Sequence, residues 1–103
     1  MDLAESINSM TNTFPKKENF NLSSQMMRAV DAVALNIAEG SMGQSNAEFK
    51  RFMGYAIRSL AETVTCLYKA EKRRYITKEE FNAAYSESFE LMNMMSAFKK
   101  NMN

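Results

Sequence analysis

Apolar residues recur every three or four positions along almost the whole chain, and this spacing constrains the fold more than any other feature. Residues three and four apart share one face of an α-helix, so each such run predicts a helix with one buried side. Four runs predict helices over residues 3–13, 22–39, 46–74 and 78–101. The alternating pattern typical of strands is nowhere sustained, so the 103 residues predict a single all-α domain.

The first two predicted helices carry signals that mark their ends. Pro15 is expected to end the first helix, because proline restricts the residue before it and has no N–H donor. Residues 16–21 are polar and predict a loop, after which Asn21 or Ser23 is expected to cap the second helix. Gly40 suits the left-handed position that follows a helix, so the second helix is expected to end there.

The two longer helices begin with capping boxes. Ser45 and Glu48, and again Thr77 and Glu80, have the spacing at which two residues satisfy free amides of a first helical turn reciprocally. The second box follows the third helix so closely that only a short turn separates the third and fourth helices. The sequence therefore predicts an antiparallel hairpin of long helices that the shorter first and second helices cannot cover completely.

The fourth helix carries more apolar surface than one small bundle needs. Its apolar residues span an arc of about 220°, whereas a surface helix needs little more than about 100°. Excess apolar surface favours association of identical copies, with Phe89, Met94 and Met102 as the expected interface residues. In the alternative interpretation Phe89 and Met94 are isolated exposed apolar residues, which are common on proteins.

Composition argues against catalysis. The chain has no histidine and one cysteine, Cys66, which removes imidazole metal sites, the commonest general base and any intrachain disulfide. We therefore expect no catalytic residue, metal, cofactor or small-molecule substrate. The first residues lack the charge pattern of an export signal, and no apolar run approaches the length of a membrane span. A cytoplasmic location without membrane attachment is the expectation.

A basic cluster surrounds the end of the third helix. Its members are Lys69, Lys72, Arg73, Arg74 and Lys78. Repeated around a ring, they would form a basic rim of the kind that neutralises nucleic-acid phosphates, and nearby tyrosines would stack on unpaired bases. In the alternative interpretation the cations complement the helix dipole and neighbouring glutamates offset them. The net charge of +1 favours this second interpretation.

Much of the sequence resembles a known bacterial family. The residues that carry the resemblance are Phe14–Glu18, Leu22, Gln25, Arg28–Ala29 and Asn36–Gly40, extended by Ser45, Glu48–Phe49, Arg51–Phe52, Ala56, Ser59–Leu60 and Glu62. The pattern is similar to that of the four-helix-bundle proteins also called 23S rRNA-intervening sequence proteins. It is more distantly similar to the accessory variability protein of diversity-generating retroelements, a pentamer that engages RNA and a reverse transcriptase. The family resemblance implies an up-and-down antiparallel four-helix bundle in a ring, usually a pentamer, with no established enzymatic activity.

Six residues of the family pattern are expected to be structural. They are Pro15, Gln25, Arg28, Asn36, Glu39 and Gly40. The polar ones lie beside core positions, where hydrogen bonds to helix ends or between helices are favoured over a ligand site, since an unpartnered buried polar group costs about 1–3 kcal/mol. The chain departs from the family pattern after Gly40, where an arginine common in the family is missing, and at Arg58, where the family has glycine.

Two functions remain open at this point. The leading hypothesis is a non-catalytic interaction or scaffold protein that forms a homo-oligomeric ring. The alternative is an accessory protein that binds RNA or a nucleoprotein through the basic cluster.

Overall fold

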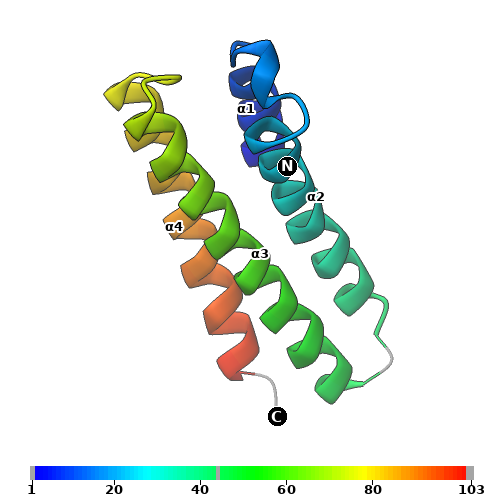
Figure 1. Ribbon diagram of the computed structural model, residues 1–103. Coiled ribbons are helices and arrows are strands. Elements are labelled where there is room, and N and C mark those ends of the chain that lie inside the picture. Colours follow the sequence, from blue (N-terminus) through cyan, green and yellow to red (C-terminus); the bar gives the residue numbers. More distant parts are fainter. Residues whose placement is uncertain (1, 44, 102–103) are drawn as a thin grey trace.

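A computed structural model describes residues 2–43 and 45–101 (Figure 1). Its four α-helices are α1 (Asp2–Thr11), α2 (Leu22–Ser41), α3 (Asn46–Lys72) and α4 (Lys78–Asn101), and a short 3-10 helix, η1 (Lys16–Glu18), lies between α1 and α2. No strand occurs in the described ranges, so the predicted all-α class is confirmed. No helix in these ranges combines the length and apolarity needed to cross a membrane. Met102 lies outside the described residues.

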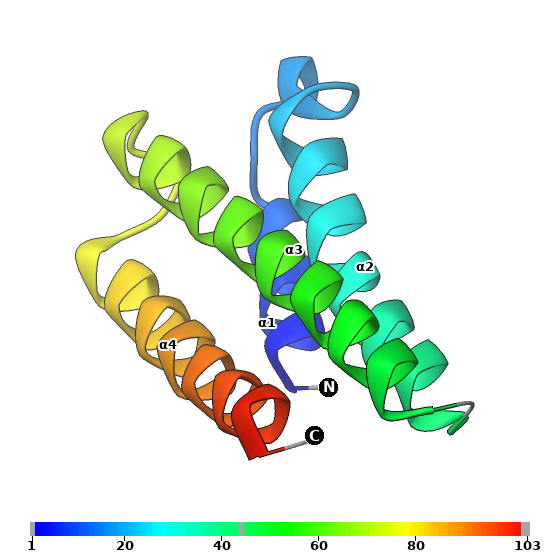
Figure 2. The same ribbon diagram turned by 90° about the horizontal axis from the view of Figure 1, so that it is seen from below.

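The helices run alternately in opposite directions, and each packs against its neighbours. The packing of α2 on α3 is the most extensive, α3 also packs on α4, and α1 contacts both α2 and α4 (Figure 1 and Figure 2). The α1–α2 connection and the α3–α4 turn lie at the same end of the bundle, which we call the turn end. This arrangement is the predicted antiparallel four-helix bundle.

The core consists of apolar side chains from all four α-helices. Among the largest fully buried ones are Leu3, Ile7, Leu22, Met26, Met53, Leu60, Leu67 and Met95. All of them lie on the predicted apolar stripes, so the periodicity identified the buried side of each helix correctly. Cys66 is buried in the same core, as its apolar neighbours in the sequence indicated.

α1 ends at Thr11, two residues before the end predicted for the helix over residues 3–13. The hydroxyls of Thr11 and Thr13 donate hydrogen bonds to the carbonyls of Asn8 and Met10, and such local bonds compete with helix continuation. At 1.5 Å per residue, α1 is about 15 Å long and α4 about 36 Å. α1 therefore lies beside only the part of α4 nearer the turn end (Figure 1).

The connection after α1 is not the plain loop predicted over residues 16–21. Pro15 precedes η1 as its N-cap, and the N–H groups of Glu18 and Asn19 donate to the carbonyls of Pro15 and Lys16. Pro15 therefore starts a short helix instead of ending α1 as predicted, since α1 already ends at Thr11.

Both predicted capping residues of the long helices are confirmed. The Ser45 hydroxyl accepts a hydrogen bond from the N–H of Glu48 at 3.1 Å. At α4 the box is reciprocal, because the N–H of Glu80 donates to the Thr77 hydroxyl at 3.1 Å and the N–H of Thr77 donates to the Glu80 carboxylate at 2.8 Å. The carboxylate of Glu48 contacts Arg51 on its own helix.

Gly40 does not occupy the left-handed position predicted for it. α2 continues to Ser41, and the left-handed glycine is Gly43, with a φ of 73°. Gly40 instead faces α3, where an added Cβ would lie 3.1 Å from Cβ of Phe52 and 3.1 Å from Cε of Met53. An added Cβ would be crowded here, because the backbone of α2 passes close to these two side chains of α3.

This contact predicts opposite effects for two glycine substitutions. Gly54→Ala, inside α3, should raise the free energy of unfolding by up to about 1 kcal/mol, because its added Cβ would meet only the flexible side chain of Lys99. Gly40→Ala should lower it by about 1 kcal/mol, because overpacking against Phe52 outweighs the gain in helix propensity. Urea denaturation followed by circular dichroism measures both, and equal stabilisation by the two variants would contradict the close approach.

Candidate interaction surfaces

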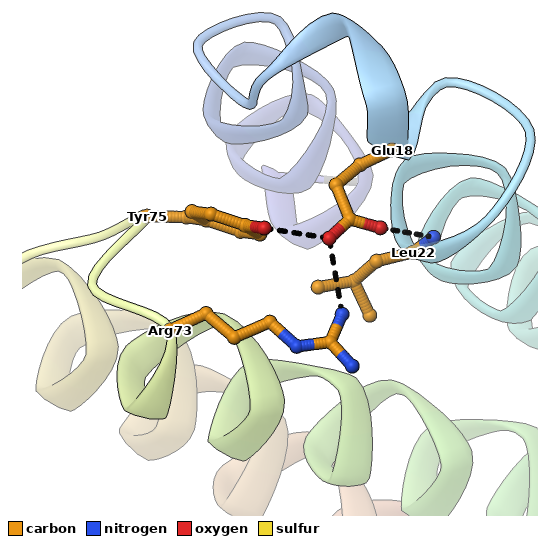
Figure 3. A network of polar contacts seen from close by, with 4 residues as sticks. All are labelled: Glu18, Leu22, Arg73 and Tyr75. Carbon is orange, nitrogen blue, oxygen red and sulfur yellow. Dashed lines mark hydrogen bonds and ion pairs between the residues drawn. The ribbon is translucent and has the colours of Figure 1, made fainter.

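A buried carboxylate ties the α1–α2 connection to the end of α3 (Figure 3). Glu18 is only 4% exposed, and its Oε2 accepts hydrogen bonds from the hydroxyl of Tyr75 at 2.6 Å and from Nη1 of Arg73 at 3.1 Å. Its Oε1 accepts from the N–H of Leu22 at 3.4 Å. One side chain thus contacts the start of α2 and two residues of the α3–α4 turn.

These contacts determine the charge state of the carboxylate. The hydrogen bond from Tyr75 lowers the pKa of Glu18 most, the Leu22 amide and the Arg73 charge lower it further, and burial opposes them. The net effect is a pKa below the ordinary value, so Glu18 is an anion at neutral pH. The same hydrogen bond raises the pKa of Tyr75, because loss of its proton would place a second negative charge beside Glu18.

The first turn of α2 is capped differently from the prediction, because the carboxylate of Glu18 accepts its hydrogen bond. Asn21 is the N-cap residue, but its side chain makes no capping hydrogen bond, and Ser23 lies inside the helix, where it is buried. The carboxylate three residues before Asn21 serves the first turn instead. The sequence offered no signal for the burial of Glu18, since its contacts with Arg73 and Tyr75 join residues more than fifty positions apart.

The basic cluster is not a set of five equivalent free cations. Arg73 is paired with Glu18, whereas Lys69, Lys72 and Lys78 are exposed. Arg74 has a φ of 63° and is therefore the left-handed residue of a Schellman motif. In this motif the N–H of Tyr75 donates to the carbonyl of Ala70 at 2.9 Å. The cluster therefore takes part in ending α3, and Lys69, Lys72 and Lys78 remain candidates for binding an anion.

An aromatic row runs along the outer side of the α3–α4 hairpin. The ring centroids of Tyr68 and Phe81 are 5.0 Å apart, those of Phe81 and Tyr85 5.6 Å, and those of Tyr85 and Phe89 6.3 Å. Beside the row lies a groove of about 220 Å³ whose lining includes Val64, Tyr85 and Phe89. We call this surface the aromatic groove. Phe89, which was predicted at an interface, is 54% exposed there.

A second apolar strip lies on α4 beyond the reach of α1. Residues of α1 meet α4 between Glu80 and Glu87, and the same helical row continues through Leu91, Met94 and Phe98. Met94, another predicted interface residue, and Phe98 are each 51% exposed. Leu91, Met94 and Phe98 form what we call the distal strip. Phe98 was assigned to the core stripe by periodicity, and it is exposed because α1 is too short to cover it.

The remaining family-pattern residues are distributed along α2. The Asn36 amide donates to the carbonyl of Ala32 at 2.8 Å, a structural contact within its own helix. Gly40 provides the close approach to α3, which is also structural. Gln25 is half-buried, whereas Arg28 and Glu39 are exposed, and their structural role stays a prediction.

Comparison with known proteins bears on the family and the fold. Residues 1–97 match the family described as 23S rRNA-intervening sequence protein. The chain is also similar to the crystal structure of a protein with unknown function from the S23 ribosomal protein family of Bacteroides thetaiotaomicron, with a TM-score of 0.89 and 24% identity over 97% of this chain and 94% of that one. This likeness shows a shared fold. No curated protein matches the chain. The similarity to the accessory variability protein stays a prediction.

The Glu18 contacts predict a specific dependence of stability on pH. A lowered folded-state pKa stabilises the fold above the unfolded value, near 4.5, and this contribution is lost as the pH falls through the folded-state value. Glu18→Gln should therefore lower the thermal midpoint at neutral pH, and its difference from the wild type should shrink in acid. Thermal melts across the pH range test this, with the exposed Glu90→Gln as control. A difference that stays constant with pH would contradict the role of the charge.

The left-handed backbone of Arg74 predicts a stabilising substitution. Arg74→Gly should raise the free energy of unfolding by up to about 1 kcal/mol, because glycine has no Cβ to clash at positive φ. Arg74→Ala keeps the Cβ and removes the same charge, so it should give no such gain. Urea denaturation of the pair separates backbone strain from charge, and equal effects would refute the strain.

Proposed function

We propose that this chain, which belongs to the 23S rRNA-intervening sequence protein family, is a non-catalytic interaction protein whose identical copies join into a closed ring. The carrying observation is the presence of two separate exposed apolar surfaces on α4, the aromatic groove and the distal strip. The resemblance described above supports a pentamer as the form of the ring. A reducing compartment such as the cytoplasm suits a chain with a single, buried cysteine.

The two surfaces face different directions. Phe89 and Phe98 are nine residues apart in α4, and at 100° per residue this places them about 180° apart around the helix. One copy therefore offers two unlike apolar patches rather than one.

This geometry favours a ring over a two-fold dimer. A two-fold interface joins the same patch on both partners and would leave the other patch in water. A head-to-tail interface joins unlike patches, so every copy buries both, and a closed rotation produces a ring. The rotation between neighbours, which sets the number of copies, depends on the docked interface.

Catalysis has little support from the described side chains. The desolvation of Cys66 raises its pKa, so its thiol is neutral at physiological pH and shielded from substrates. The exposed surfaces of α4 are apolar and aromatic, and they suit association rather than proton transfer.

The alternative, RNA binding by the basic cluster of the α3–α4 turn, has weaker support. Arg73 is paired with Glu18, and Arg74 takes part in ending α3. Glu79 and Glu80 are exposed in the same region and offset Lys78. Charge at this turn alone therefore does not distinguish a binding surface from an ordinary helix end.

Two complementary variants test the ring directly. Phe89→Glu places a charge on the aromatic groove and Phe98→Glu places one on the distal strip, and burying an unpaired carboxylate costs several kcal/mol. Each variant alone should be a monomer by light scattering across a dilution series. An equal mixture should give a dimer and nothing larger, because each variant retains the surface that the other has lost.

Ala97→Glu is the matched control, since this exposed residue lies on α4 about 80° from Phe89 and about 100° from Phe98. It should retain the oligomer of the wild type. A wild-type monomer at every concentration would refute self-association. A wild-type dimer that one variant abolishes and mixing does not restore would refute the head-to-tail arrangement.

A further inference from the structure

The turn end carries an aromatic ring that the fold does not use. Phe20 lies between η1 and α2, and its side chain is 98% exposed. Full exposure distinguishes it from the aromatic groove, where neighbouring rings cover part of each residue. Lys16 and Lys17, both exposed, precede Phe20 in the same connection. An aromatic ring and two cations therefore share one short exposed segment.

The Glu18 contacts add a third cation from a distant part of the chain. Figure 3 shows Arg73 extending from the end of α3 to the carboxylate of Glu18. The Arg73 side chain remains 43% exposed, and its contact with Glu18 uses Nη1, one nitrogen of a guanidinium that has five N–H donors. An open hollow is lined by Lys17, Asn21 and Arg73, with Glu18 and Tyr75 completing it, and Asn21 directly follows Phe20 in the chain.

Lys16, Lys17 and Arg73 outnumber the one carboxylate among these residues, Glu18, with which Arg73 is paired. This carboxylate is 4% exposed and is held by the Tyr75 hydroxyl, the Leu22 amide and the Arg73 guanidinium. Lys16 and Lys17 therefore face solvent beside an acid that is turned inward. The surface around Phe20 is locally basic, although the net charge of the chain is only +1.

We propose that this surface binds single-stranded nucleic acid, with an unpaired base stacked on Phe20 and neighbouring phosphates held by Lys16, Lys17 and Arg73. Single strands alternate flat bases with phosphates, and proteins bind them by combining aromatic platforms with a cationic groove. The bases of a duplex are already stacked on one another and are not free to cover Phe20. This inference does not depend on the proposed ring, because all of its residues belong to one copy.

Fluorescence anisotropy with a labelled oligouridylate of about 12 nucleotides tests the proposal at low salt. Phe20→Ala should weaken binding about tenfold or more, because stacking is lost, whereas Phe20→Trp should retain it. The double variant Lys16→Gln/Lys17→Gln should reduce the salt slope by about 1.4, since each phosphate contact to a single strand contributes about 0.7. Lys99→Gln/Lys100→Gln removes the same charge from exposed residues near the end of α4, away from the turn end, and should leave the slope unchanged.

Three results would overturn the proposal. One is equal binding by Phe20→Ala and the wild type, which would leave general electrostatic attraction as the explanation. Another is equal or tighter binding of a duplex of the same length. The third is lack of oligouridylate binding together with sedimentation on vesicles of phosphatidylserine, which would assign Phe20 and its lysines to an anionic membrane surface. The same anisotropy measurement on the Phe89→Glu variant, which is expected to be a monomer, tests binding at this site without the ring. A failure of the ring proposal is thereby distinguished from a failure of this one.

Discussion

The buried carboxylate of Glu18 is the contact on which the turn end of the bundle depends. It accepts hydrogen bonds from the start of α2, from Tyr75 and from Arg73, so it joins the connection after α1 to the end of α3. A buried anion is tolerated only when such donors replace water. The same contacts that satisfy this charge place Arg73 beside the α1–α2 connection, where it lines an open hollow together with Lys17 and Asn21.

The length of α1 has an equally specific consequence at the other end. A helix of ten residues cannot cover a helix of twenty-four, and the uncovered part of α4 exposes Met94 and Phe98. The aromatic groove arises independently, because Tyr85 and Phe89 lie on the side of α4 that borders α3. Two unlike apolar surfaces on one helix are the physical basis for proposing head-to-tail association. Membership of the family does not by itself indicate a head-to-tail arrangement.

The parts of the fold that were predictable are those governed by local chemistry. The caps at Ser45 and Thr77 require only neighbours three residues away, and both are formed. Phe89 and Met94 were identified as exposed because the arc of α4 is too wide for one bundle to bury. Gly40 was misplaced because its local pattern fits a helix end, whereas its actual constraint is the close approach of Phe52 and Met53 on a neighbouring helix.

The four helices, their buried sides and the surplus of apolar surface on the last one follow from the order of residues alone. Periodicity and capping operate within a few residues, so they can be read along the chain. Three features depend instead on how the helices pack: Glu18 is buried and paired, Gly40 lies close to α3, and Arg73 contacts the α1–α2 connection. Each of these depends on which distant segments approach one another, and that approach is set by the packing of whole helices rather than by neighbouring residues.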